Sequence, residues 1–205
     1  MNKEPDKYFY TNISDYVIGD SAKAGELYLR KIISGFSCPL NQDVEDFLKD
    51  NAIGFTKEHK SVTYLVGSNE HNVIVGYFTI TIKPINVIVD SSTNSKIKRK
   101  CEKISILDEN TNTYRPAAYL IGQLGKNYTN KYNELITGQE LLDLALKIIK
   151  KTQYYVGGLL VFLEAKNEDK LLSFYAKNGF KIFNVSETKI SQKHGYELVQ
   201  MIKTL

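Results

Sequence analysis

The chain has 205 residues, of which 42% are hydrophobic and 24% charged, a balance typical of a globular protein with one sizeable core. Its net charge of +4 favours anionic partners only weakly and does not by itself indicate nucleic-acid binding. Cys38 and Cys101 lie in no paired-ligand spacing, and no run approaches the ~20 apolar residues of a membrane span. These features argue against a disulfide framework, a zinc site and a membrane protein, so we expect one cytoplasmic domain over residues 1–205.

The first third of the chain is predicted to be helical. Residues 1–12 read as a polar leader without the apolar stretch of a signal peptide. A helix capped by Asp20 or Ser21 ends near Gly35, and Asn41 starts a second helix that stops around Gly54. Two amphipathic helices therefore precede any clear strand.

A hairpin and a polar insertion follow. Val62 to Val66 and Val73 to Ile82 are rich in β-branched and aromatic residues and flank a turn-like segment, which predicts a β-hairpin. Residues 90–116 are polar and contain a basic run at positions 96–100. We expect an insertion there with at most one short helix.

The next segments predict a parallel strand–helix–strand unit. Ala117 to Leu124 reads as a strand in which Gly122 suggests a bulge, Gly125 to Asn133 as a loop, and Gly138 to Lys151 as a helix with a broad apolar stripe. Leu159 to Leu163 is an apolar run of the kind found in a strand covered on both faces. We expect the two strands to be parallel neighbours.

The last elements predict how the sheet closes. Asn167 is placed to cap a helix that runs through Lys177 and ends at the left-handed stop of Gly179. Phe180 to Val185 and Tyr196 to Lys203 alternate as strands and should close the sheet as an antiparallel pair. The pattern predicts an α/β (α+β) fold with a mixed central sheet.

Two features of the second half carry chemistry. Thr137 and Glu140 have capping-box spacing, so other amides of that first helical turn could hold an anion such as a pyrophosphate, and Gly138 would allow close approach. An ordinary capped helix is the simpler reading. Tyr175 lies on the apolar face of its helix, either as a core residue or as a phenol that donates a proton to a leaving thiolate. The three histidines occur singly, and no metal site is expected.

Together these pieces resemble the GNAT superfamily of N-acetyltransferases, from about Tyr64 to Leu205. The resemblance implies a splayed parallel strand pair, helices on both faces of the sheet, and acetyl-CoA as cosubstrate. It places pantetheine along the backbone of Leu124, Gly125 and Lys126. The Phe174-Tyr175 pair with its Gly179-Phe180 ending matches the family's pattern and makes Tyr175 the general acid.

The resemblance also assigns the pyrophosphate loop. In the family this loop carries Gln or Arg, two variable residues, Gly, one variable residue, then Gly or Ala. The matching stretch here keeps only the last glycine, Gly138, with Asn133 and Ile136 at the other two positions. The implied coenzyme-binding residues near the helix start and ahead of the tyrosine helix are Asn133, Leu135, Ile136, Thr137, Gly138, Gln139 and Asn167.

The acceptor amine and its base are less defined. The strand 117–124 has no acid where many family members carry a glutamate, and Glu164 is the remaining candidate, although a solvated strand-end carboxylate is the simpler reading. A missing base favours an α-amine, which titrates near ~8, over a lysine amine.

A closer resemblance concerns residues 116–124 and the ending 174–180, which look like bacterial toxin acetyltransferases acting on aminoacyl-tRNA. This resemblance implies three partners: tRNA, an antitoxin and a second copy of the chain. Lys96, Lys98, Arg99 and Lys100 would then meet RNA phosphates, unless they form a solvated charge run. Two rivals stay open: a non-catalytic coenzyme-binding module, and an RNA-binding protein without coenzyme.

Overall fold

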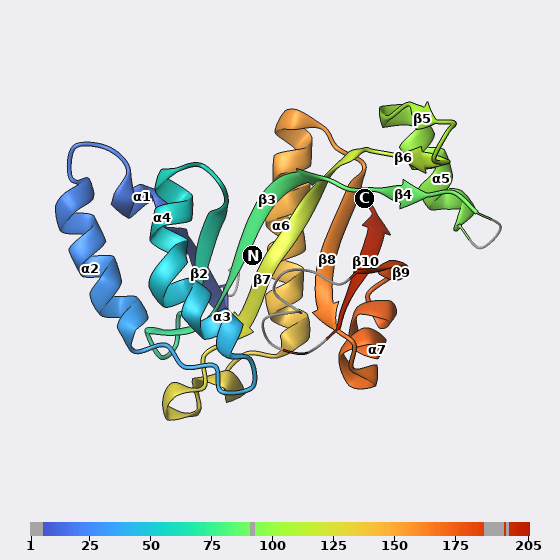
Figure 1. Ribbon diagram of the computed structural model, residues 1–205. Coiled ribbons are helices and arrows are strands. Elements are labelled where there is room, and N and C mark those ends of the chain that lie inside the picture. Colours follow the sequence, from blue (N-terminus) through green and yellow to red (C-terminus); the bar gives the residue numbers. More distant parts are fainter. Residues whose placement is uncertain (1–5, 91–92, 187–194, 196) are drawn as a thin grey trace, which may run out of the picture. The chain divides into compact units, whose positions relative to one another are not determined.

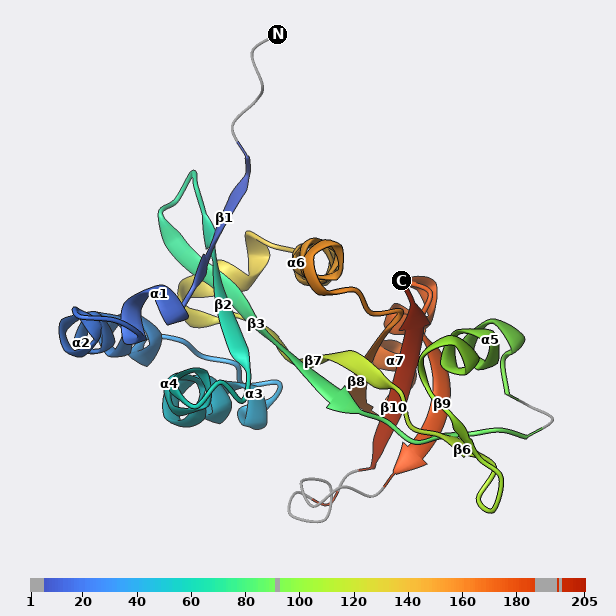
Figure 2. The ribbon, with the colours of Figure 1, turned by 90° about the horizontal axis from the view of Figure 1, so that it is seen from above.

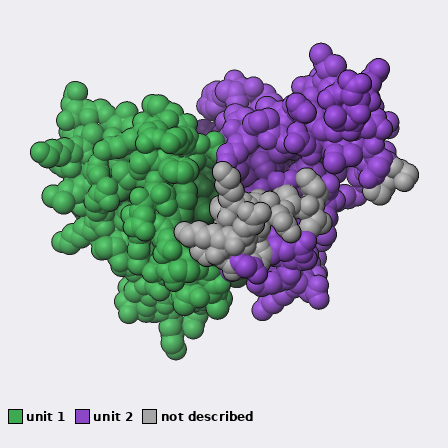
Figure 3. All heavy atoms as spheres, in the orientation of Figure 1, with its two compact units in different colours: residues 1–81, 122–148 green, residues 82–121, 149–205 purple. Residues whose placement is uncertain are grey.

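The computed structural model describes residues 6–90, 93–186, 195 and 197–205 (Figure 1). It divides into two compact units, which Figure 3 shows in different colours. Unit 1 comprises Met1–Thr81 and Gly122–Ile148, and unit 2 comprises Ile82–Ile121 and Ile149–Leu205. Each unit takes its residues from two stretches of the chain, and the expectation of one domain stays a prediction.

A seven-stranded mixed sheet has the strand order β1-β2-β3-β7-β8-β10-β9. Its strands are β1 (Tyr8–Asn12), β2 (Val62–Ser68), β3 (Val73–Pro84), β7 (Ala117–Lys126), β8 (Leu160–Lys166), β9 (Lys181–Ser186) and β10 (Leu198–Thr204). β7 and β8 are parallel, whereas β1–β2, β2–β3, β8–β10 and β9–β10 are antiparallel. The predicted mixed α/β architecture is therefore confirmed, including the hairpin and the closing pair. Tyr196, where the last strand was expected to start, lies outside the described residues.

The amino-terminal segment differs from the prediction. Residues 8–12, read as part of a leader, form β1, which pairs with β2 from Tyr8↔Ser68 to Asn12↔Tyr64. Residues 1–5 of the expected leader lie outside the described part of the chain. A short helix α1 (Ser14–Val17) follows β1. The segment was missed because it is only five residues long, Tyr-Phe-Tyr-Thr-Asn, and does not alternate between apolar and polar residues.

Helices of unit 1 follow the predicted pattern with one extension. α2 (Ala22–Ser34) begins after Ser21 and ends before Gly35, as expected. The second helix begins after Asn41 as α3 (Gln42–Asp46), continues through a π-helical turn (Phe47–Asn51) and ends as α4 (Ala52–Lys57). It passes through Gly54 because a helix tolerates a single glycine at a cost of about 1 kcal/mol.

Helices cover both faces of the unit 1 strands, as the sequence resemblance implied (Figure 2). The fully buried Tyr77 of β3 donates its hydroxyl hydrogen bond to the carbonyl of Val44 in α3. Its neighbour Gly76 faces the other way, where a Cβ would lie 3.3 Å from Leu141 of α6 (Gly138–Val156). Alternation along one strand thus assigns α3 and α6 to opposite faces.

Gly125 in β7 has no room for a side chain. A Cβ there would lie 2.3 Å from Cγ1 of Val44, so Gly125→Ala is expected to lower the free energy of unfolding by about 1–3 kcal/mol. The control is Gly54→Ala: it has no neighbour within 4 Å and lies in α4, so it should raise stability by about 0.5–1 kcal/mol. Chemical denaturation of both variants checks this, and equal effects would contradict the packing argument.

Unit 2 contains the parallel pair and the carboxyl-terminal strands. The register pairs Tyr119 with Val161 and Ile121 with Leu163. Helix α7 (Asp169–Lys177) follows β8, and Gly179, just after its C-cap Asn178, has a φ of +81°, which confirms the predicted left-handed stop. β8 is buried along most of its length, as its apolar run predicted.

The segment 90–116, expected to be a loose insertion, is more ordered than predicted; its residues 91–92 are not described. It contains helix α5 (Ser95–Ile104) and belongs to a three-stranded sheet of order β4-β6-β5, formed by β4 (Val87–Ile88), β5 (Leu107–Asp108) and β6 (Thr113–Tyr114). Ile97 and Cys101 are buried in one cluster with Val87 and Tyr114. The order comes from these few apolar residues, which the polar composition concealed.

Candidate functional site

The amino end of α6 carries the predicted capping box. The Thr137 amide donates to Oε2 of Glu140 at 2.8 Å, and the Glu140 amide donates to Oγ1 of Thr137 at 3.1 Å. The Thr137 carbonyl accepts the first helical hydrogen bond, from Leu141, at 3.2 Å. Thr137 is thus the N-cap. Gly138 is the first helical residue, and helix geometry leaves its amide without an intrahelical carbonyl partner.

Lys7 neutralises the carboxylate at this helix end. Its Nζ lies 2.8 Å from Oε1 of Glu140, and the Tyr8 hydroxyl donates to the Leu135 carbonyl at 2.8 Å. Burial pushes the pKa of Glu140 upward, but hydrogen bonds from Lys7 and Thr137 outweigh this and hold it at about 2. Glu140 therefore adds little net negative charge beside an approaching anion. Sequence reasoning missed Lys7, because it was read as part of the leader.

The Glu140 contacts predict a pH-dependent contribution to stability. Since the folded-state pKa lies below the ordinary value of 4.5, this contribution is present above about pH 4.5 and is lost as the pH falls toward 2. Glu140→Gln should cost no more than about 1 kcal/mol at pH 7, because the pair is partly exposed, and almost nothing near pH 2. Urea unfolding at both pH values measures this. Lys7→Met should reproduce part of the loss, and a pH-independent difference would contradict the assignment.

Ile136, which stands where the family carries glycine, is a core residue. Its side chain is 1% exposed. The backbone before Ile136 is also fixed, since Lys126 Nζ donates to the Asn133 carbonyl at 2.9 Å and the Tyr8 hydroxyl donates to the Leu135 carbonyl at 2.8 Å. Because Ile136 packs inward, the substitution does not put a bulky side chain on the surface before α6.

The stretch between β7 and α6 is partly helical rather than the expected loop. Gly125 and Lys126 still belong to β7, and a 3-10 helix (Thr129–Glu134) follows, with left-handed φ values of 48° at Asn130 and 62° at Lys131. Leu124 and Lys126 are half-buried and Gly125 is buried. These residues lie in unit 1, together with the amino end of α6.

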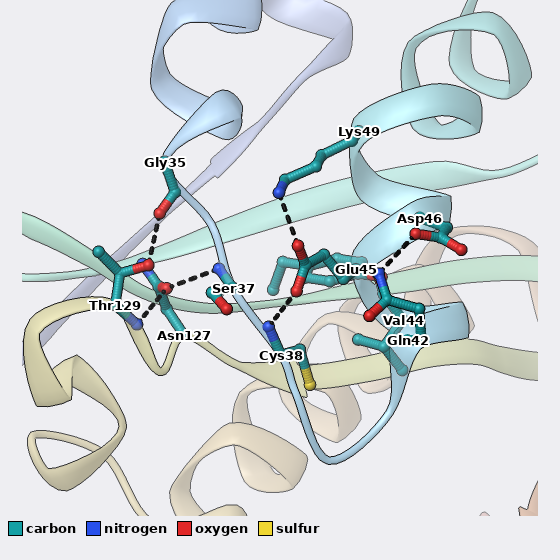
Figure 4. A network of polar contacts seen from close by, with 11 residues as sticks. Gly35, Ser37, Cys38, Gln42, Val44, Glu45, Asp46, Lys49, Asn127 and Thr129 are labelled. Carbon is teal, nitrogen blue, oxygen red and sulfur yellow. Dashed lines mark hydrogen bonds and ion pairs between the residues drawn. The ribbon is translucent and has the colours of Figure 1, made fainter.

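Asn127, directly after β7, is the centre of a buried polar network (Figure 4). Its Oδ1 accepts from the amides of Ser37 at 3.2 Å and Thr129 at 3.1 Å, and its Nδ2 donates to the Ile74 carbonyl at 2.8 Å. It is 5% exposed. The network fastens the segment between α2 and α3 to the end of β7. Sequence reasoning did not single out Asn127, because nothing in its local pattern marks a buried asparagine.

Tyr175 lies on α7 in unit 2 and is 8% exposed. Its ring contacts those of Phe174 and Phe180 at centroid distances of 5.0 Å and 5.8 Å. Burial raises the pKa of Tyr175 to about 12, so the phenol stays protonated at physiological pH. No hydrogen bond of its hydroxyl to another described residue is found, which is unusual for a buried tyrosine.

The expected cap at Asn167 is wrong. Glu168 occupies the N-cap position of α7, without a side-chain hydrogen bond. The amide of Asn167 instead donates to the Glu197 carbonyl at 3.0 Å, and its side chain donates to the Glu197 carboxylate. Asn167 is held there because it extends the β8–β10 pairing by one residue.

Glu164 does not have the environment of a catalytic base. It is exposed on β8 and accepts a hydrogen bond from Gln200 Nε2 at 2.8 Å. The solvated reading of this carboxylate is therefore the better one. In the described part of the chain, no group of three or more His, Cys, Asp or Glu could hold a metal ion.

The residues predicted to bind the coenzyme are divided between the two units. Unit 1 contains the site residues from Leu124 to Gln139, and unit 2 contains Asn167 and Tyr175. Gln139 is exposed, and its side chain donates to Asp143 at 3.0 Å. The assignment of all these residues to acetyl-CoA, and the splaying of β7 from β8, stay predictions.

The mixed sheet with one parallel pair and helices on both faces of the unit 1 strands is the fold that the sequence resemblance predicted. No protein-family model matches the chain, and no curated protein matches it significantly. Among described residues, none of the helices is long and apolar enough to span a membrane.

Solved structures similar to this chain include those of the proteins AtaT and KacT. AtaT complexed with acetyl-methionyl-tRNAfMet matches with a TM-score of 0.62 at 16% identity, over 96% of this chain and 94% of AtaT. A tyrosine-to-phenylalanine mutant of KacT matches with 0.60 at 18% identity, over 95% and 94%. An AtaT mutant toxin bound to the C-terminus of the antitoxin AtaR and acetyl-CoA matches with 0.57 at 15%, over 97% and 94%. At these identities the likeness concerns the fold.

Proposed function

We propose that this protein is an N-acetyltransferase that moves acetyl from acetyl-CoA to a primary amine. The observation that carries the proposal is Tyr175, a buried and protonated phenol at the position where the resemblance implies the general acid. Support also comes from the fold, since the solved structures that match nearly the whole chain include complexes with acetyl-CoA.

The reaction uses direct attack. The neutral amine attacks the thioester carbonyl, the C–N bond forms and the C–S bond breaks. The leaving thiolate takes the proton of Tyr175, the amine releases a proton to solvent, and the Tyr175 phenolate then takes a proton back from solvent. Strand amides near Leu124 and Gly125 stabilise the oxyanion.

The amino end of α6 binds the pyrophosphate in this proposal. The first-turn amides around Gly138 and the helix dipole favour an anion, and Lys7 offsets the charge of Glu140. The pantetheine pairs with the backbone of Leu124, Gly125 and Lys126. Asn133 lies on this path through its carbonyl, which accepts a hydrogen bond from Lys126 Nζ, and the buried side chain of Ile136 supports the same backbone from the core.

The acceptor in the sharper form of the proposal is the α-amine of an aminoacyl-tRNA. Glu164 is exposed and bonded to Gln200, so the described part of the chain offers no evident base, and an α-amine needs less help than a lysine amine. The fold is shared with AtaT, whose structure contains acetyl-methionyl-tRNAfMet. Lys96, Lys98 and Arg99 are exposed on α5 and available to phosphates, whereas Lys100 is half-buried near the Leu205 carbonyl.

The same proposal brings the partners and location implied by the resemblance. An antitoxin would bind this chain as AtaR binds AtaT, and a cytoplasmic location would give access to tRNA. Co-purification with the product of a neighbouring gene tests for an antitoxin. The mass of the protein in solution tests for a homodimer.

One experiment tests the function directly. The protein is incubated with labelled acetyl-CoA in three separate reactions, which contain aminoacylated tRNA, peptides or small amines as acceptors. We expect label in the tRNA. Label in peptides or small amines alone would refute the tRNA acceptor. If acetyl-CoA binds but no fraction is labelled, the protein is a non-catalytic coenzyme-binding module, and Tyr175→Phe should then change nothing.

A further inference from the structure

The last two turns of α6 expose aromatic and basic side chains together. Tyr154, Tyr155 and Val156 are 85%, 70% and 66% exposed, three consecutive large apolar residues on the surface. Lys150 and Lys151, also exposed, each lie one turn before a tyrosine. Residues four apart are neighbours on a helix surface, so Lys150 is a neighbour of Tyr154 and Lys151 a neighbour of Tyr155.

This surface is held in place and is not a frayed helix end. The Gly157 amide donates to the Gln153 carbonyl at 2.8 Å, and Gln153 Nε2 donates to the Gly158 carbonyl at 2.6 Å. The Tyr119 hydroxyl donates to the Gly157 carbonyl, and a Cβ on Gly158 would lie 2.6 Å from the Tyr119 ring. The φ values of +78° and +108° at the two glycines require glycine there. The end of α6 that carries the exposed rings is therefore fixed, so its backbone is already ordered for a ligand.

The charges indicate which ligand. Residues 149–156 of α6 contain two lysines and no acidic residue. Tyrosine is enriched in protein interfaces and in RNA-binding surfaces, whereas lysine is depleted from protein interfaces. Lysines beside exposed rings suit RNA, because the ammonium groups meet phosphates while unpaired bases stack on the rings.

From this arrangement we infer that Lys150, Lys151, Tyr154 and Tyr155 form an RNA-binding surface that takes phosphates and unpaired bases. The inference rests on the proposed function, since the RNA is the one that carries the acceptor amine. Binding at this surface requires neither acetyl-CoA nor the proton of Tyr175.

Equilibrium binding of unfractionated tRNA, without acetyl-CoA, tests the surface between 50 and 200 mM salt. The variant Lys150→Glu/Lys151→Glu should weaken binding and lower the salt slope by about two, roughly one per lysine. Tyr154→Ala/Tyr155→Ala should weaken binding about tenfold per tyrosine, and the matched Phe/Phe variant should bind like the wild type.

Two controls separate the explanations. Lys170→Glu/Lys177→Glu on α7 changes the net charge equally and should affect tRNA binding much less. Tyr175→Phe should bind tRNA normally but lose acetyl transfer. A wrong assignment of the RNA-binding surface can therefore be distinguished from a wrong assignment of the enzyme activity. Light scattering and thermal unfolding check assembly and folding of each variant. The inference is overturned if the folded Glu/Glu and Ala/Ala variants bind tRNA as tightly as the wild type does. If these variants also have a smaller particle mass in solution, the surface is an interface between copies of the chain.

Discussion

Tyr175→Phe is expected to slow acetyl transfer by about 10²–10⁴-fold, the usual contribution of a positioned general acid. Phenylalanine keeps the ring contacts with Phe174 and Phe180 and removes only the proton. Since no described residue is hydrogen-bonded to the hydroxyl, stability should change little. Steady-state kinetics with the labelled acceptor measures the effect, and calorimetric binding of acetyl-CoA should be nearly unchanged.

The pH profile tests whether the proposed acid is buried. Burial raises the pKa of Tyr175 to about 12, so the acid is fully protonated across the working range and loses its proton only above about pH 11. The rate of the wild type should therefore rise as the amine is deprotonated near ~8 and then stay level. An alkaline fall centred near pH 10 would indicate an ordinary exposed phenol and argue against the assignment.

Asn127→Ala should lower the free energy of unfolding by about 3 kcal/mol. The side chain makes three hydrogen bonds to backbone groups of β3, the 3-10 helix and the segment after α2, and alanine would leave those partly buried groups without this partner. Denaturant unfolding measures the loss. Limited proteolysis should in addition cut the segment 35–41 faster, because Asn127 and Thr129 hold it at Ser37 and Gly35 (Figure 4).

Asn130 provides the matched control. It is an exposed asparagine three residues further on, with a left-handed φ of 48° that glycine adopts easily. Asn130→Gly should stay within about 0.5 kcal/mol of the wild type. If both variants lost the same stability, the loss would come from the loop conformation and not from the buried network.

Sequence patterns predicted the second half of the fold well because its signals are local. The Thr137–Glu140 capping box, the apolar run of β8 and the left-handed Gly179 all depend on residues within one or two turns. Burial of Tyr175 also followed from helical spacing. For the same reason Ile136 could be recognised as a departure from the family loop, but its place in the core could not.

Features that depend on distant partners were missed. β1 exists because it pairs with β2, and Lys7 matters because Glu140 lies beside it, and neither partner can be identified from the polar segment around residue 7. Asn167 has the residue type of a cap but pairs with Glu197. Asn127 is defined by three partners, two of them more than 50 positions away in sequence.

The ion pair of Lys7 and Glu140 joins residues 133 positions apart. At a synthesis rate of 5–20 residues per second, roughly 7 to 27 seconds separate their emergence from a ribosome. Until Glu140 has emerged, the first turn of α6 cannot form, and Lys7, next to β1, has no carboxylate to pair with. A nascent chain therefore cannot assemble this helix end until Glu140 has followed Lys7 and the whole of β1 out of the ribosome.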